Sequence, residues 1–457
     1  MRTIIRNGTV VREGERISAD VLTENGTIRR IAPQIDEPAD REIDATGCYV
    51  LPGFIDTHTH LDLDLTNTVT ADNFETGTRA AIVGGTTTVL DFATQDRGMT
   101  LQEALDKWHR KADGKSSCNY GFHMAMSEWN EARKAEIDAM IAQGVTSFKM
   151  YMVYPAMRVT DGQIYDALHF MERKDCIVGV HCENYDLLNA RIRELHEAGR
   201  FDPMAHAESR PDAVEAAGVS TLMKTAELAE APAWVVHVSC EASLDEMETA
   251  RGRGVEVYAE TCPQYLVLDI AQYREPDAEK YIMSPPLRYA HDREALLNAL
   301  ADGSIDFIGT DHCSFTMAQK ALGNGDFAGV PNGGAGIQNR AELVYTAAVR
   351  SGIISIEKMA ALLSENAARI FGMYPKKGVL SEGSDADIVV FDPNVPHTIS
   401  WKTNLHNCDN SPFEGMPVLG KTRDVLLGGE LVVENGTLIK PHCGQYVFRG
   451  PSARPRK

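Results

Sequence analysis

The sequence lacks the features that mark membrane-spanning, secreted and disulfide-linked proteins. It has no apolar run near the roughly 20 residues that a membrane helix needs, and its nine cysteines include no Cys-x-x-Cys pair. Its first residues run straight into a strand-like pattern with an Asn-Gly pair and do not resemble a signal peptide. We therefore expect reduced thiols, a cytoplasmic location and no membrane partner.

Basic charge is also scarce. The 457 residues hold 45 Lys and Arg against 65 Asp and Glu, a formal net charge of −20. This balance disfavours nucleic acids and anionic membrane surfaces as partners. The basic end of the chain, Arg449–Lys457, is interpreted as a solvated tail. Hydrophobic residues make up 43%, enough for a full core, and the length indicates one large domain with a smaller one.

Both ends of the chain carry the pattern of β-hairpins. Apolar and polar residues alternate around three Asn-Gly pairs, which favour tight turns, in Thr3–Val11, Asp20–Ile31 and Asp424–Lys440. Another strand is expected over Ala386–Phe391, stopped by Pro393. These segments fit a small β domain assembled from residues 1–52 and 375–457.

The middle of the chain alternates short apolar strands with amphipathic helical stretches. The helical stretches include Leu101–Ala112, Glu131–Ala142, Ala213–Ala229 and Asp292–Ala301. The expected strands are Phe54–His60, Thr86–Phe92, Asn119–Met126, Val145–Met152, Ile177–Glu183, Ala233–Ser239, Val255–Thr261 and Asp306–His312. Eight such units in about 250 residues predict a (β/α)8 barrel, here over residues 53–374. A doubly wound open sheet would usually carry a Gly-rich phosphate loop after its first strand, and none is present.

The first barrel strand contains the most informative motif of the chain. His58 and His60 lie two residues apart in Gly53–His60, and alternate residues of a strand share one face. Two convergent imidazoles form half of a site for zinc or its first-row neighbours. The pair alone is equally compatible with a solvated polar strand.

Further polar residues fall at or near the ends of other barrel strands. They are Lys149, His181, His237 and Asp311, and the carboxyl ends of barrel strands are where active sites are built. Singly, each histidine could be a hydrogen-bonded core residue, and Lys149 could be a surface lysine. Jointly, four imidazoles, an ammonium and a carboxylate would be costly to bury without a metal.

Lys149 is unusual in such a set, because an ammonium has no lone pair and repels cations. A lysine among metal ligands must be deprotonated or chemically converted. Carboxylation by carbon dioxide would give a carbamate whose two oxygens can bridge two metals. The spacing of the residues does not show which of these applies.

Taken together, the motifs resemble the cyclic amidohydrolases, specifically the hydantoinase and dihydropyrimidinase group. The matching stretches are Pro52–His60, Gly84–Thr87, Ser147–Tyr154, Glu260–Leu266, Ser284–Arg288 and Pro331–Gly333. The resemblance covers the chain essentially end to end. It implies a (β/α)8 barrel with a small β-sandwich domain built from both termini. It also implies a homo-oligomer, since relatives are commonly tetramers.

The resemblance also assigns roles to the residues. His58, His60 and Asp311 would hold one divalent ion, and His181 and His237 a second, with carboxylated Lys149 and a hydroxide bridging them. Zinc is the usual metal, and Mn²⁺ and Co²⁺ are alternatives.

The implied reaction opens a hydantoin or dihydropyrimidine ring to an N-carbamoyl amino acid, with Asp311 as the proton shuttle. Tyr154 would hydrogen-bond the reacting carbonyl, and backbone groups at Ser284 and Asn339 would bind the small cyclic amide. Tyr154 could otherwise be a core aromatic, and Ser284 and Asn339 ordinary loop residues.

Several departures and rival readings bear on the substrate. Leu61 stands where dihydroorotases and allantoinases typically have arginine, which counts against a carboxylate-bearing ring. An allantoinase-like activity remains an alternative. The scaffold proteins called collapsin-response mediators lack most of the ligands that are present here, and mononuclear deaminases usually lack the lysine. A phosphotriesterase-like hydrolase shares the metal set, but the stretches Glu260–Leu266 and Ser284–Arg288 favour the cyclic amidohydrolases.

Overall fold

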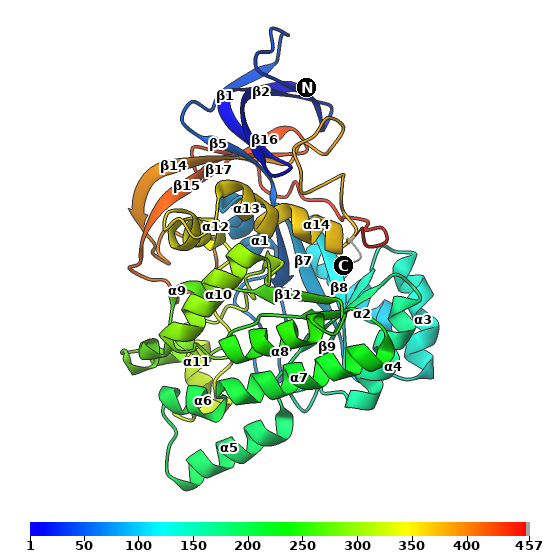
Figure 1. Ribbon diagram of the computed structural model, residues 1–457. Coiled ribbons are helices and arrows are strands. Elements are labelled where there is room, and N and C mark those ends of the chain that lie inside the picture. Colours follow the sequence, from blue (N-terminus) through cyan, green and yellow to red (C-terminus); the bar gives the residue numbers. More distant parts are fainter. Residues whose placement is uncertain (454–457) are drawn as a thin grey trace.

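A computed structural model describes residues 1–453 and divides into a barrel and a mixed sheet that lies across one end of it (Figure 1). The strands of the barrel are β6 (Phe54–Thr59), β7 (Thr86–Gln95), β8 (Asn119–Met126), β9 (Ser147–Tyr151), β10 (Ile177–His181), β11 (Ala233–Val235), β12 (Val257–Thr261) and β13 (Phe307–Ile308). They pair in parallel in chain order. A bridge between Thr59 and His312 brings the two ends of this sheet together. The predicted (β/α)8 barrel is confirmed.

Helices surround the barrel, and the four predicted helical stretches are present as α2, α3, α7 and α10. The helices that precede β11 are α1 (Phe74–Val83), α2 (Leu101–Ala112), α3 (Glu131–Ile141), α4 (Asp161–Glu172), α5 (Tyr185–Glu197), α6 (Pro203–Ser209) and α7 (Asp212–Ala229). Those that follow are α8 (Glu241–Arg251), α9 (Pro263–Val267), α10 (Ala290–Asp302), α11 (Met317–Lys320), α12 (Arg340–Val344), α13 (Ile356–Ala360) and α14 (Asn366–Ile370). Within the described residues, no helix combines the length and the apolar character needed to cross a membrane.

The second sheet combines strands from both ends of the chain. They are β1 (Arg2–Arg12), β2 (Glu15–Glu24), β3 (Thr27–Ala32), β4 (Arg41–Asp44), β5 (Tyr49–Pro52), β14 (Ile388–Thr398), β15 (Pro417–Leu427), β16 (Glu430–Glu434) and β17 (Thr437–Leu438). The two halves meet where β5 pairs antiparallel with β14, with Val50 opposite Val390. Residues of both halves share one apolar core. The exact domain boundaries stay a prediction.

Two predictions about strand ends are wrong: the hairpin turn at Asn7-Gly8 and the end of a strand at Pro393. Asn7-Gly8 lies inside β1, where the register against β2 shifts between Ile5 and Gly8, so the pair forms a bulge and not a hairpin turn. The chain reverses instead at Glu13-Gly14. Strand β14 also continues past Pro393 to Thr398, with an irregularity between Asp392 and Pro396. The irregularity lets the strand continue without ladder hydrogen bonds from the prolines.

The interpretation of Arg449–Lys457 as a solvated tail is wrong for Arg449. Its side chain is buried, and its guanidinium donates to Ser147 Oγ at 2.6 Å and to the carbonyl of Phe122. The neighbouring Val447 bonds to the carbonyl of Tyr120 on β8. This end of the chain is therefore part of the barrel's packing. Residues 454–457 lie outside the described residues.

Candidate metal centre

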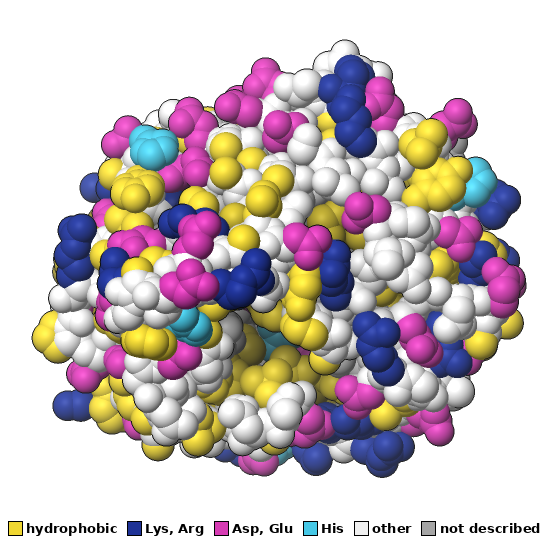
Figure 2. All heavy atoms as spheres, turned by 90° about the horizontal axis from the view of Figure 1, so that it is seen from below, with side chains coloured by type: hydrophobic (Ala, Val, Ile, Leu, Met, Phe, Trp, Pro, Cys, Tyr) yellow, Lys and Arg dark blue, Asp and Glu magenta, His cyan; other side chains and the backbone are white. Residues whose placement is uncertain are grey.

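Five barrel strands bring the six predicted ligands to one end of the barrel. His58 and His60 come from β6 and the residue after it, Lys149 from β9, and His181 from the end of β10. His237 and Asp311 follow β11 and β13. This end lies opposite the mixed sheet, and Figure 2 shows its surface with a hollow in which hydrophobic side chains are visible.

The first half of the centre joins two imidazoles to one carboxylate. Asp311 Oδ1 lies 3.1 Å from both His58 Nε2 and His60 Nε2, and all three side chains can reach one metal ion. Burial opposes ionisation of Asp311, but the imidazoles of His58 and His60 outweigh it and hold its pKa well below the usual range. Asp311 is therefore a carboxylate at neutral pH.

The second half consists of two facing histidines. His181 Nδ1 lies 3.0 Å from His237 Nε2, and both residues are buried. Burial lowers the pKa of each imidazole, that of His237 most strongly, so both rings are neutral and keep a lone pair for a metal. His60 Nδ1 and His237 Nδ1 are also buried and have no hydrogen-bond partner among the described residues.

Lys149 lies between these halves in the barrel and is 1% exposed. Among the described residues, no carboxylate forms an ion pair with it, and its Nζ faces the rings of Phe92 at 4.9 Å and Tyr151 at 5.2 Å. Burial lowers its pKa to about 8. The neutral amine is the form that reacts with carbon dioxide, and burial makes this form more accessible in Lys149 than in an exposed lysine.

Two buried glutamates orient the histidines, and sequence reasoning did not assign them a role. Glu260 lies 3.0 Å from His58 Nδ1, and Glu183 lies 2.7 Å from His181 Nε2. Arg210 in turn donates to Glu183 at 2.8 Å. Carboxylates behind metal-binding histidines fix the orientation of the ring. The available signal was an acidic residue within or directly after a buried strand.

The predicted substrate residues Tyr154 and Ser284 lie near each other, since Ser284 is among the groups that act on the pKa of Tyr154. Burial is the main influence on Tyr154 and raises the pKa of its hydroxyl, which therefore stays protonated and can donate. Ser284 Oγ donates to Asn332 Oδ1 at 3.1 Å. Asn332 was noted as part of a motif but was not selected as a site residue.

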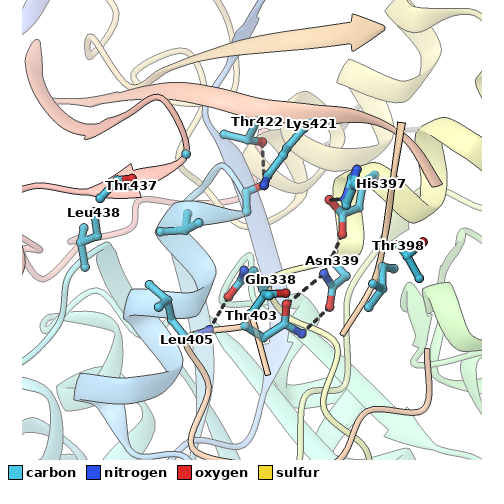
Figure 3. A pocket seen from close by; sticks show the side chains of 16 residues that line it. Gln338, Asn339, His397, Thr398, Thr403, Leu405, Lys421, Thr422, Thr437 and Leu438 are labelled. Atoms are coloured by element: carbon cyan, nitrogen blue, oxygen red, sulfur yellow. Dashed lines mark hydrogen bonds and ion pairs between the residues drawn. The ribbon is translucent and has the colours of Figure 1, made fainter. Parts of the chain in front are cut away.

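Asn339 lines a different part of the molecule from Tyr154, Ser284 and the predicted metal ligands (Figure 3). Its amide bonds to Glu342 at 2.6 Å, and Asn404 donates to its oxygen at 2.9 Å. Together with His397 these residues line a cavity of about 310 Å³ formed partly by β14 and β15, and none of the six predicted metal ligands lines it. The substrate role of the Asn339 backbone stays a prediction, whereas Asn332 contacts Ser284 directly.

Three site residues adopt the left-handed backbone conformation. The φ angles are 65° for Tyr154, 39° for His237 and 51° for Asp311. For residues other than glycine such geometry costs on the order of 1–3 kcal/mol each and is concentrated at functional sites. The surrounding packing therefore holds these side chains in directions that an unconstrained chain would avoid.

Both the sequence and the fold of this chain are similar to those of known proteins. Residues 49–432 match the sequence model of the amidohydrolase family. The chain is 42% identical over 455 residues to a D-hydantoinase of Geobacillus stearothermophilus, with 98% of this chain and 97% of that protein covered. It is 38% identical over 460 residues to a D-phenylhydantoinase of Escherichia coli, with 100% of both covered. The crystal structure of a dihydropyrimidinase from Brevibacillus agri matches with a TM-score of 0.98 and 41% identity over 100% of both chains.

Proposed function

Because this chain belongs to the amidohydrolase family and is a cyclic amidohydrolase, we propose that it hydrolyses a hydantoin or dihydropyrimidine ring to an N-carbamoyl amino acid. The relatives described above are D-hydantoinases and a dihydropyrimidinase. The observation that carries the proposal is Lys149, a buried amine without a carboxylate partner among the described residues. It lies in the same barrel mouth as two sets of metal-binding side chains.

The donor set fits two divalent ions, for which zinc is the first choice and Mn²⁺ or Co²⁺ alternatives. His58, His60 and Asp311 would hold one ion, and His181 and His237 the other. Carboxylated Lys149 would contribute one oxygen to each. The Nε2 atoms of His60 and His237 face Asp311 and His181 within this group of ligands, which supports the assignment. When bound, the ions lower the pKa of a water molecule toward about 7 and polarise the substrate carbonyl.

The chain's own residues would carry the proton and hold the ring. The water oxygen adds to the ring carbonyl carbon, and the bond from that carbon to the ring nitrogen breaks. Asp311 takes the proton from the attacking water and delivers it to the leaving nitrogen. The Tyr154 hydroxyl donates to the carbonyl oxygen as it gains charge, a contact worth roughly 3–4 kcal/mol in other enzymes.

Ser284 and Asn332 would bind the amide edge of the ring beside Tyr154. Their contact with each other supports this role for Asn332. The loop after β6 and residues 155–161 would line the ring substituent, because both follow strands that carry site residues. In the first loop, Leu65 and Val69 are about two-fifths exposed, which favours an apolar substituent.

A hydrolysis panel with metal analysis tests the proposal. Purified protein should open dihydrouracil, hydantoin or one enantiomer of phenylhydantoin, and should contain about two metal ions per chain. Comparable rates on allantoin and dihydroorotate would overturn the proposed substrate class. If the protein binds no metal and opens no ring even after divalent metal is supplied, the proposed reaction is wrong.

The Asp311→Asn variant tests the proton shuttle in the same assay. We expect turnover to fall by at least a hundredfold, because an amide cannot accept the proton from water, while the melting temperature stays near the wild-type value. Circular dichroism and metal content provide the controls. Near-normal turnover would remove Asp311 from this role.

We also propose a homotetramer in the cytoplasm. Relatives are commonly tetramers, and all nine cysteines are free, which suits a reducing compartment. Light scattering should report about four times the chain mass of 50.2 kDa. A mass of one chain would contradict the assembly but not the reaction.

A further inference from the structure

Lys320, the last residue of α11, is a second buried lysine near the substrate-binding residues. It is 1% exposed, and no carboxylate forms an ion pair with it among the described residues. Its Nζ instead donates to three backbone carbonyl oxygens, at 2.8 Å, 2.7 Å and 2.7 Å. An ammonium has three N–H donors, so each donor meets one acceptor.

The three carbonyls belong to the two segments that carry the substrate-binding residues. One is the carbonyl of Ile282, two residues before Ser284. The other two belong to Pro331 and Gly333, which flank Asn332 on both sides. One ammonium therefore joins the segment of Ser284 to the segment of Asn332.

We propose that Lys320 is a positioning residue that holds Ser284 and Asn332 at the spacing the substrate ring requires. The proposal rests on the proposed function, since it assumes that these two residues bind the ring. Lys320 itself does not touch the substrate in this account. It acts through the backbone on either side of Asn332 and before Ser284.

Further hydrogen bonds also join the segment of Ser284 to the segment of Asn332. Gly333 N donates to the same Ile282 carbonyl at 3.0 Å, and Ser284 Oγ donates to Asn332 Oδ1. A Cβ on Gly333 would lie 2.3 Å from the carbonyl oxygen of Cys313, so the backbone beside Asn332 packs directly against the Cys313 segment. The ammonium of Lys320 binds the same stretch of backbone through the carbonyl of Gly333.

The charge of Lys320 matters because a neutral side chain cannot satisfy three acceptors from one atom. Burial lowers its pKa to about 7, and the three carbonyl oxygens favour the protonated form. The ring of Phe315 lies 5.4 Å from Nζ, and Glu279 is the acidic group that acts on it from a neighbouring segment, with the thiols of Cys313 and Cys408.

The test compares Lys320→Met with Lys377→Met in the full-length, metal-loaded enzyme. Lys377 is a matched control, because it is also buried but pairs with Asp385 and Asp387, away from the site. Both variants lose a buried ammonium, and both should melt at a lower temperature. We expect KM for the ring substrate to rise at least tenfold in Lys320→Met, with kcat changed less than threefold and metal content unchanged. In Lys377→Met we expect KM to change less than twofold.

The outcomes separate the inference from the proposed function. If the wild type opens no ring substrate, the proposed function fails and the inference with it. If the wild type is active but folded Lys320→Met keeps the wild-type KM, the inference alone is overturned and Lys320 is structural. Should Lys320→Met not fold, Lys320→Gln keeps two donors and is measured in the same way. An unchanged KM in that variant would also overturn the inference.

Discussion

At the scale of single residues, the site depends on a lysine that would be unfavourable in its ordinary form. Lys149 is buried against Phe92 and Tyr151, and no carboxylate forms an ion pair with it among the described residues, although Glu260 and Asp311 attract it from a greater distance. A buried ammonium without a directly paired counter-charge costs several kcal/mol. Conversion to a carbamate would replace the positive charge with a negative one and give the two metal ions a shared ligand.

The Lys149→Ala variant should therefore lose the paired metal site. We expect bound metal to fall below one ion per chain and ring hydrolysis to fall more than a thousandfold, since Ala offers no ligand to either ion. Metal analysis and turnover provide the measurements. Added propionate should restore part of the activity, because its two carboxylate oxygens can occupy the vacated space. Full activity with two bound metals would end the carbamate assignment.

A second single residue, His206, makes the stability of the folded chain depend on pH. His206 is buried, and its Nε2–H donates to the carbonyl of Met283 at 2.8 Å, next to Ser284. Burial, with a smaller effect of Arg210, lowers its pKa to about 3, whereas an unfolded chain would protonate it near 6.5. Because the unfolded state binds the proton more readily, this group contributes stability above pH 6.5 that is lost as the pH falls toward 3.

Replacement of His206 should remove this contribution to the pH profile. Wild type should lose about 2 kcal/mol relative to His206→Gln between pH 7.5 and pH 5, from 1.36 kcal/mol per pH unit. Urea unfolding of both proteins in metal-free form at the two pH values provides the measurement, since the metal-site histidines are then common to both. Parallel changes in the two proteins would show that His206 does not titrate on unfolding.

At the scale of elements, one glycine determines how closely a helix approaches the site. Gly218 lies in α7, and a Cβ there would be 2.7 Å from the carbonyl carbon of Cys182 and 3.0 Å from Glu183 N. These residues directly follow His181. Helix α7 therefore packs against the backbone that fixes His181 and its partner Glu183.

Gly218→Ala should push this backbone away from α7. We expect a melting temperature several degrees lower and metal affinity reduced at least tenfold, because disturbed support of a ligand typically costs 10–100-fold in affinity. Gly162→Ala is the control, since Gly162 is exposed near the start of α4 and its Cβ would meet little. That change should leave metal binding unchanged and stability equal or higher. Equal effects of the two changes would contradict the argument.

Elements with a strong pattern could be predicted, and elements that depend on local context could not. The eight barrel strands could be located because each is a short, largely apolar run and amphipathic helical stretches alternate with them. Asn7-Gly8 looked like a turn, but cross-strand pairing to β2 absorbs it as a bulge. Lys320 and Asn332 were not assigned roles, because their contacts join loop segments that show no periodicity in the sequence. Glu183 lies only two residues after His181, but their spacing alone does not show that its carboxylate turns back to the imidazole.

At the scale of the whole molecule, a single side chain connects the first and last strands of the barrel. Arg340 is 1% exposed, and its Nη1 donates at 2.8 Å to the carbonyls of Ile55 in β6 and Ile308 in β13. Its Nη2 donates to Thr86 at 3.1 Å. This contact could not be predicted, because Arg340 begins the short helix α12 and lies far from β6 in the chain.

Arg340→Met should weaken the barrel as a whole. We expect the free energy of unfolding to fall by about 3 kcal/mol or more, since buried carbonyl oxygens lose their donors. Arg350→Met, a change at an exposed position, should have little effect. Thermal melting of both variants provides the comparison. A melting temperature equal to that of wild type in Arg340→Met would show that the backbone alone keeps the barrel closed.

The mixed sheet has a consequence for the order of events during synthesis on the ribosome. Strands β1 to β5 are made first, but β5 pairs with β14, which is made several hundred residues later. At elongation rates of about 5–20 residues per second, the edge of β5 waits on the order of tens of seconds for its partner. During that interval it offers unpaired N–H and C=O groups to any other nascent strand. The newborn chain should therefore depend on chaperones until its last strands emerge.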